Sequence, residues 1–194
     1  MIIFEDLLMR KNFGSQSWLF PMPVLIVATY DENGNPDAMN AAWGGIHDTN
    51  QIGVCIDPGH KTAANLQKTG AFTVSIGDAE HVVECDYVGI VSGNNVPDKF
   101  AQAGFHAVKS EFVNAPIIAE LPMTLECKLL SYDVKTGCAT GEIVNISAAD
   151  TILDADGNIS LEKFTPICFN PVNHTYTALG KTVGKAFEAG KILK

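Results

Sequence analysis

Short runs of apolar and β-branched residues, separated by turn signals, recur along the first half of the chain. Residues 23–30 (PVLIVATY), 51–56 (QIGVCI) and 71–76 (AFTVSI) are runs of this kind, and such runs predict strands. A dense turn signal, residues 31–37 (DENGNPD), follows the first run. Residues 38–46 then resume as a further strand, which predicts a hairpin.

The second half carries longer strands. Residues 123–134 and 138–149 read as two long strands joined at residues 135–137 (KTG). Residues 164–169 predict a late strand. We expect the tail, residues 179–193, to be partly helical.

Three short helices interrupt this series of strands. Residues 61–68 predict a helix with Gly70 as its C-cap. Residues 82–91 predict a second helix, and residues 97–104 a third, with an early Pro and a closing Gly. Consecutive strands with short inserted helices indicate a mainly β (α+β) fold with a closed or nearly closed antiparallel barrel. A doubly wound α/β fold would need regular alternation of strands and longer helices.

Composition fits one globular domain over residues 1–194, since neither repeats nor a Pro/Ser-rich linker divide the chain. Of its residues 46% are hydrophobic and 18% charged, and the net charge is −9. Such a charge opposes the phosphate contacts that hold nucleic acids and adhesion to anionic membranes. No apolar run reaches the ~20 residues that span a bilayer. The N-terminus lacks a signal-peptide layout, so we expect a cytoplasmic protein.

The five cysteines are widely spaced and form no C-x-x-C motif. Zinc sites and dithiol redox sites are therefore not indicated. We expect reduced thiols, mostly buried as small apolar residues.

Residues 39–47 (MNAAWGGIH) form the first candidate site. Asn, Ala and Gly are poor strand residues, yet this strand carries several of them around Trp43. Small side chains let a flat ligand approach the backbone, and an indole offers a stacking surface. The alternative is a barrel corner in which glycines relieve bending and Trp43 lies in the core.

Residues 57–62 (DPGHKT) form the second candidate site. They place His60, Lys61 and Thr62 at the N-terminus of a predicted helix. Helix N-termini offer unpaired N–H groups and a partial positive charge, which suit a phosphate. The alternative is that Thr62 or Asp57 caps the helix and Lys61 is solvated. Neither a Walker loop nor a Gly-x-Gly-x-x-Gly motif is present.

A resemblance to a known family extends over nearly the whole chain, from about residue 13 to residue 187. The segments that carry it are residues 20–24 (FPMPV), 30–34 (YDENG), 39–45 (MNAAWGG), 60–62 (HKT), 71–75 (AFTVS), 86–90 (DYVGI), 92–93 (SG), 98–100 (DKF), 176–180 (YTALG) and 183–184 (VG). Together they resemble the flavin reductase-like, FMN-binding split-barrel family, and within it the flavoredoxin branch.

The resemblance implies a six-stranded antiparallel split barrel with short peripheral helices, a homodimer and a tightly held FMN. It implies that residues 40–43 line the isoalloxazine, that residues 60–62 hold the phosphate, and that Tyr176 covers the ring. The full cofactor-binding set that we expect is Met39, Asn40, Ala41, Ala42, Trp43, His47, His60, Lys61, Thr62, Ser92 and Tyr176.

The chemistry implied is redox chemistry by the flavin, for which no side chain need act as a general acid or base. One hypothesis is a flavin reductase-like oxidoreductase that takes electrons from NADH, NADPH or a protein donor and passes them to a small acceptor or redox partner. A second is an electron carrier without its own nicotinamide site. A third is a barrel that binds a small ligand without redox chemistry.

Overall fold

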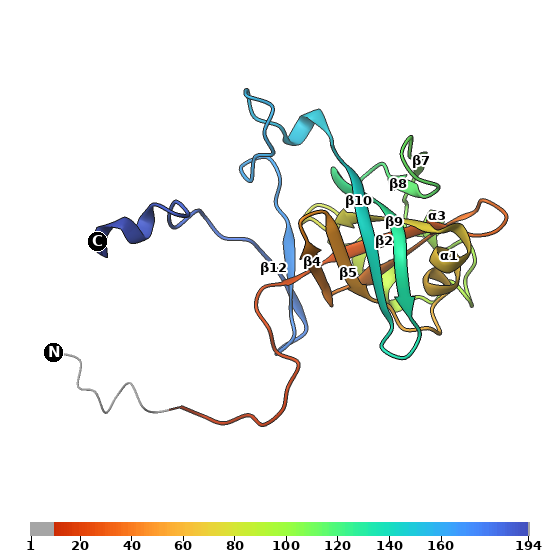
Figure 1. The fold of residues 1–194 in the computed structure, drawn as a ribbon, viewed down its shortest axis with the longest axis horizontal. Coiled ribbons are helices and arrows are strands. Elements are labelled where there is room, and N and C mark those ends of the chain that lie inside the picture. Colours follow the sequence, from red (N-terminus) through yellow and green to blue (C-terminus); the bar gives the residue numbers. More distant parts are fainter. Residues whose placement is uncertain (1–9, 194) are drawn as a thin grey trace.

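The computed structural model describes residues 10–193. Residues 1–9 and 194 lie outside the described part (Figure 1), so the expectation of an N-terminus without a signal-peptide layout falls largely outside it. Within residues 10–193, no helix combines the length and the hydropathy that crossing a lipid bilayer requires.

The elements follow one another as mostly short strands with a few helical turns. The strands are β1 (Met22–Pro23), β2 (Leu25–Tyr30), β3 (Pro36–Ala41), β4 (Gly44–Asp48), β5 (Gln51–Cys55), β6 (Ala71–Ile76), β7 (Ala107–Lys109), β8 (Pro116–Ile118), β9 (Met123–Asp133), β10 (Cys138–Ala148), β11 (Ile167–Asn170) and β12 (Thr175–Ala178). The helices are α1 (Lys61–Thr69), α2 (Val82–Ile90) and α3 (Lys99–Gln102), with 3-10 turns η2 (Asp150–Ile152) and η3 (Ala189–Leu193).

The main sheet is antiparallel and rolled. Its seven strands run in the order β3-β2-β6-β9-β10-β5-β4, so β3 and β4 lie at opposite edges although only two residues separate them in the chain. In a flat sheet, six spacings of about 4.8 Å would hold these edges roughly 29 Å apart. The three Cα–Cα steps from Ala41 to Gly44 reach at most about 11 Å. The sheet must therefore curl until its edges meet, which makes a split barrel (Figure 1).

The two faces of β2 pack into different cores. Leu25 and Val27 lie in the cluster inside the barrel, whereas Ile26 and Ala28 lie in a cluster that includes residues of α2. Because both faces are covered, β2 is a continuous apolar run rather than an alternating one.

The structure confirms the fold class. Counting β3 and β4 as one interrupted strand gives the six strands that the resemblance implied. The long hairpin of β9 and β10 lies where it was predicted, and α1 ends at Gly70, whose φ is 69°. A three-stranded sheet, β1-β11-β12, packs outside the barrel.

Several sequence predictions need correction. The strand predicted over residues 38–46 is broken, because the chain changes from one sheet edge to the other at residues 42–43. The third predicted helix shrinks to α3, a single turn. β7, β8 and β12 were not predicted, since runs of three or four residues carry little periodicity. Only the last residues of the tail are helical, as η3.

Candidate functional site

The first candidate site lies at the barrel seam, where Ala42 and Trp43 connect β3 to β4. The carbonyl of Trp43 accepts a hydrogen bond of 2.8 Å from the backbone N–H of Cys55, which ties the crossing to β5. At Gly44, a Cβ would lie 2.8 Å from Cδ1 of Leu25 and 2.9 Å from the carbonyl oxygen of Gly53. Glycine is therefore required at the seam because two strands approach it closely.

The seam decides which side chains face outward. Met39 and Ala41 point into the barrel core, so only their backbone can reach a ligand. Trp43 is 57% exposed, which rules out the alternative that it lies in the core. Two residues apart on a continuous strand, Ala41 and Trp43 would share a face. Strand alternation stops where β3 ends, and the two side chains face opposite ways.

A cleft of about 630 Å³ opens on the outer face of β4 and β5. Trp43, Gly45 and His47 line one side, and the N-terminal arm, residues 10–21, adds Trp18 and Leu19. Apart from its chain neighbours, no residue has an atom within 4 Å of the position that a Cβ on Gly45 would take. The cleft has a typical ligand-site volume, and its wall lets a flat ring approach the backbone.

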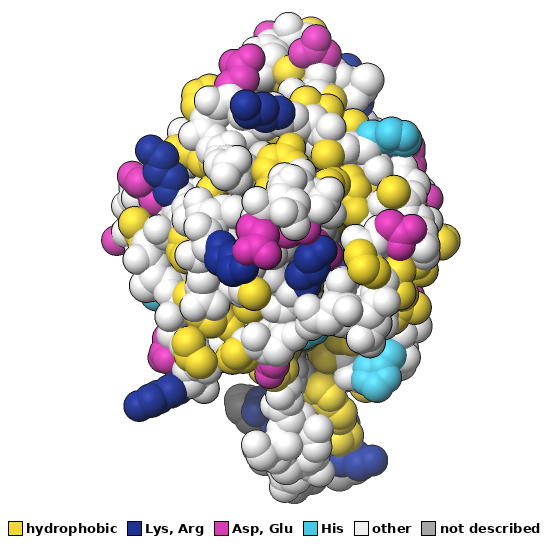
Figure 2. All heavy atoms as spheres, turned by 90° about the vertical axis from the view of Figure 1, so that its right-hand side faces the viewer, with side chains coloured by type: hydrophobic (Ala, Val, Ile, Leu, Met, Phe, Trp, Pro, Cys, Tyr) yellow, Lys and Arg dark blue, Asp and Glu magenta, His cyan; other side chains and the backbone are white. Residues whose placement is uncertain are grey.

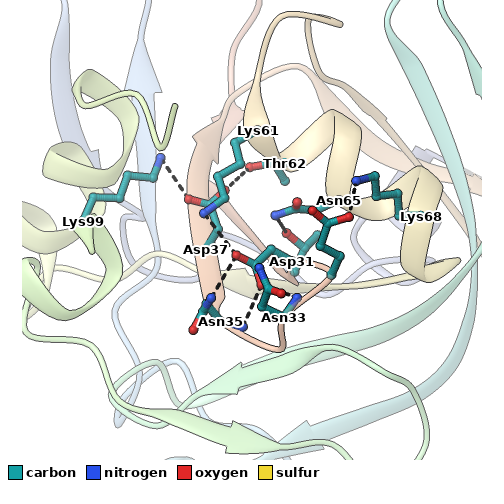
Figure 3. Close-up of polar contacts among 11 residues, drawn as sticks. Asp31, Asn33, Asn35, Asp37, Lys61, Thr62, Asn65, Lys68 and Lys99 are labelled. Carbon is teal, nitrogen blue, oxygen red and sulfur yellow. Dashed lines mark hydrogen bonds and ion pairs between the residues drawn. The ribbon is translucent and has the colours of Figure 1, made fainter. Parts of the chain in front are cut away.

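The second candidate site is the N-terminus of α1. His60 is the N-cap residue and makes no side-chain cap hydrogen bond. Lys61 Nζ lies 3.6 Å from Asp31 Oδ2, and Thr62 is buried with its hydroxyl donating to Asp37 Oδ2 at 2.8 Å (Figure 3). In this arrangement Lys61 and backbone N–H groups are the donors that an anion could reach.

The alternative role for this segment, a side-chain cap, is not what the structure contains. Asp57 Oδ1 accepts the backbone N–H of Gly59 at 2.8 Å and so stabilises the turn before the helix. Thr62 bonds across to β3 instead of to its own helix.

A buried ion pair, Asp37 and Lys99, lies behind the N-terminus of α1. Lys99 Nζ is 3.7 Å from Asp37 Oδ1 (Figure 3). It also donates to the carbonyls of Val88 at 3.2 Å and Val91 at 3.0 Å. Asp37 Oδ1 is buried without a hydrogen bond. Burial lowers the pKa of Lys99, against the opposing effect of Asp37. Lys99 therefore ties the end of α2 to β3.

Ser92 lies in the loop that follows α2, beside this pair. A Cβ on Gly93 would come within 2.5 Å of Asp37 Oδ1 and 3.1 Å of Lys61 Cδ, so the loop lies directly on both side chains. Asn94 Nδ2 donates to the carbonyl of Gly59 at 2.8 Å. The loop that contains Ser92 thus lies against Lys61 and against the turn before α1.

Asn40 and Tyr176 form a third group. Tyr176 donates its phenolic proton to Asp86 Oδ1 at 2.7 Å, and Asn40 Nδ2 donates to Tyr176 Oη at 3.4 Å and to the carbonyl of Cys85 at 3.1 Å. Burial, followed by the hydrogen bond and charge of Asp86, raises the pKa of Tyr176 above its ordinary value. Tyr176 stays neutral and fixes α2 against β12.

The expected site residues therefore fall into three groups: the cleft wall, the α1 N-terminus and the Asn40–Tyr176 contact. A hollow of about 380 Å³ extends from Trp43 and Cys55 to Asp57 and Pro58, immediately before His60. It extends from the cleft wall to the turn that precedes α1. Figure 2 looks onto the side that carries α1 and shows basic side chains next to acidic ones there, which limits the positive potential.

Sequence reasoning missed Asp37 and Lys99. In the sequence Asp37 belongs to a turn signal, and the segment DKF at residues 98–100 contributes only to the resemblance. The only sequence signal for a buried Lys99 was its place next to Phe100, on a helix too short to show a polar face.

Comparison with known proteins gives consistent results. A flavoredoxin of Desulfovibrio vulgaris (Miyazaki F) has a TM-score of 0.90 and 38% identity, and the match covers 94% of this chain and 100% of that chain. A flavoredoxin from Methanosarcina acetivorans shares the fold, with a TM-score of 0.86, 24% identity, and coverage of 96% and 100%.

An uncharacterised protein of Aeropyrum pernix is 28% identical over 154 residues, which are 78% of this chain and 58% of that protein. The chain thus spans less than two thirds of this curated relative. The family model for the flavin reductase like domain matches residues 17–162. The fold comparison and the family model agree, and the chain belongs to the flavin reductase like domain family.

Proposed function

We propose that the chain binds FMN and acts as a flavin reductase-like oxidoreductase. Electrons would come from NADH, NADPH or a protein donor and pass to a small acceptor or a redox partner. The observation that carries this proposal is the exposed small-residue wall at the seam, with Trp43 beside it, over a cleft of about 630 Å³.

The residues present fit the cofactor. Gly45 leaves open space against the backbone, where peptide groups can meet the polar edge of an isoalloxazine. The α1 N-terminus, without a side-chain cap, supplies N–H donors for the phosphate, and Lys61 supplies a cation. When bound, the flavin supplies the electron-transfer chemistry.

The protein's own residues would position the cofactor and shield it from water. Asp37 and Lys99 hold the loop after α2 against α1. The backbone N–H groups at the N-terminus of α1 and the ammonium of Lys61 would therefore keep fixed positions around the phosphate. Trp43 and His47 border the cleft, and Trp18 closes part of it from the arm.

A second candidate is a flavoredoxin-type electron carrier without a nicotinamide site. It is favoured by the 38% identity and full-length coverage of the Desulfovibrio flavoredoxin. Steady-state oxidation of NADH or NADPH by the flavin-loaded protein separates the two. Turnover with either nicotinamide supports the reductase. Reduction by a protein donor only supports the carrier.

The phosphate position is tested by Lys61→Ala. Losing a charge-assisted hydrogen bond worth about 1.5–3 kcal/mol should weaken FMN binding roughly 10- to 150-fold. Riboflavin has no phosphate, so its dissociation constant should not change. Both constants can be measured by fluorescence titration of the flavin-free protein.

Lys68→Ala is the matched control. Lys68 lies on the same helix, but its ammonium pairs with Glu32 on the surface at 2.6 Å. This change should leave both dissociation constants as they are. Equal losses for FMN and riboflavin in Lys61→Ala would instead move the phosphate away from α1. A protein that is colourless and binds no added FMN would overturn the proposed function.

A further inference from the structure

Cys55 and Cys138 lie directly opposite each other at the open end of the β5–β10 pair. They are register partners in this antiparallel ladder. The next pair toward the turn is hydrogen-bonded, because the N–H of Ile56 donates to the carbonyl of Gly137 at 2.7 Å. Hydrogen-bonded and non-hydrogen-bonded pairs alternate, so the two cysteines form a non-hydrogen-bonded pair.

This position suits a disulfide. In non-hydrogen-bonded pairs the Cα atoms are about 4.5 Å apart, inside the range of roughly 4.4–6.8 Å that disulfides span. Val54 and Ala139 point into the barrel core, so alternation turns Cys55 and Cys138 to the outer face together. The two thiols interact: burial raises the pKa of Cys55 most, and the charge and hydrogen bond of Cys138 raise it further.

The pair is also accessible. Both cysteines line the cleft beside Trp43, and Cys55 is exposed. The sequence expectation of mostly buried thiols holds for Cys85 and Cys127 but is wrong for this pair. Cys168 has register partners other than cysteine, Pro23 and Thr177.

A metal site is a poorer interpretation. Among residues 10–193, no group of three or more His, Cys, Asp or Glu side chains is arranged to hold an ion. Two thiols alone leave a tetrahedral ion such as Zn²⁺ two ligands short.

We propose that Cys55 and Cys138 are a reversible dithiol–disulfide pair that exchanges with a small disulfide entering the cleft. One thiolate attacks a sulfur of the external disulfide, forms a mixed disulfide and releases one external thiolate. The second thiolate attacks the protein sulfur of the mixed disulfide and releases the other. Two protein thiols thus become one disulfide while the external disulfide becomes two thiols, which take up the two protons. No flavin takes part in this exchange, although the cleft is the one proposed to hold the flavin. The test reads the state of the cysteines alone, so its failure and the failure of the proposed function are distinguishable.

The test is equilibration of the purified full chain with oxidised glutathione, followed by denaturing alkylation with N-ethylmaleimide and peptide mass spectrometry. All five cysteines should be labelled before oxidation. Afterwards Cys55 and Cys138 should be recovered as one cross-linked peptide pair, while the other three stay labelled. Excess dithiothreitol should restore full labelling.

Three variants make the test specific. Cys55→Ser and Cys138→Ser should each abolish the cross-link and leave the remaining cysteine as a stable glutathione adduct. Cys168→Ser should form the cross-link as the wild type does. A wild type that keeps both thiols, stops at a glutathione adduct, or links other cysteines would overturn the proposal. A cross-link that dithiothreitol cannot reverse in the folded protein would also overturn it.

Discussion

Trp43 is a large aromatic side chain that the fold leaves on the surface, although it lies between two strands of the barrel. The segment MNAAWGG indicated that it faces a ligand rather than the core, and its exposure is consistent with that. Its position on the outer face, opposite to that of Ala41, could not be predicted. The sequence does not show that the strand breaks at residue 42.

The emission of Trp43 should report cofactor binding. An indole beside a flavin transfers its excitation and is quenched, so adding FMN should lower the fluorescence of Trp18→Phe, which retains only Trp43. Trp43→Phe retains Trp18 and shows how far the arm reaches the same cofactor. Unchanged emission from Trp43 on addition of saturating FMN would place the flavin elsewhere.

The Asp37–Lys99 pair should be costly to break. Both side chains are almost completely buried, so Asp37→Asn strands a buried ammonium and should reduce the free energy of unfolding by about 3–5 kcal/mol. The new amide oxygen can still accept the hydrogen bond of Thr62, which isolates the loss of charge. Chemical denaturation of the flavin-free protein measures the change.

Glu32→Gln provides the comparison, because it breaks the exposed pair with Lys68 and should cost less than about 1 kcal/mol. Adding Lys99→Met to Asp37→Asn should recover part of the loss, since no unpaired charge then remains. Similar losses for Asp37→Asn and Glu32→Gln would show that the buried pair contributes little.

Among the elements, β10 shows how the sheet can roll tightly. Gly141 is buried in this strand, and a Cβ there would lie 2.4 Å and 2.7 Å from ring carbons of Phe72 on β6. Because Gly141 has no side chain, the ring of Phe72 can occupy the space next to it inside the barrel.

Gly141→Ala should destabilise the protein by about 1–3 kcal/mol through overpacking. Gly53→Ala is the matched change on the neighbouring strand β5, where a Cβ would meet His47 at an ordinary 3.8 Å. Thermal unfolding should show a clear drop in Tm for the first variant and little change for the second. A small effect of Gly141→Ala would mean that Phe72 can move aside.

The elements that the sequence predicted best are those with local signals: the long β9–β10 hairpin, and α1 with Gly70 at its end. What it could not predict are features set by pairing between distant strands. The Cys55–Cys138 juxtaposition depends on the register of β5 against β10, and the Asp37–Lys99 contact on how α2 and α3 pack on β3. Neither leaves a periodic pattern in the sequence.

The molecule as a whole is a barrel from which both described ends extend as arms on the same side (Figure 1). Val183 and Phe187 in the C-terminal arm are 97% and 99% exposed. Apolar side chains presented in this way are typical of interaction surfaces. They support the homodimer that the resemblance implies, and we propose that its interface, which would include these arms, helps to build the flavin site.

Light scattering should therefore give twice the mass of a single chain. Val183→Ser with Phe187→Ser should shift the equilibrium toward monomer, because each removes apolar area from the contact. Val108→Ser is the control: Val108 is half-exposed in β7, on the opposite side of the barrel from the arms. A wild type that is monomeric with FMN bound would refute the shared site.

The two-residue crossing at Ala42 and Trp43 has a consequence for how this protein can vary in evolution. Surface loops usually absorb insertions at little cost, and the turns at residues 31–35 and 154–158 should do so here. The crossing resembles a loop but joins two paired edges. One added residue would shift β4 by one position against β5. Each side chain of β4 that now faces outward would then face inward. We therefore expect relatives to differ by substitutions in this crossing but to keep its length of two residues.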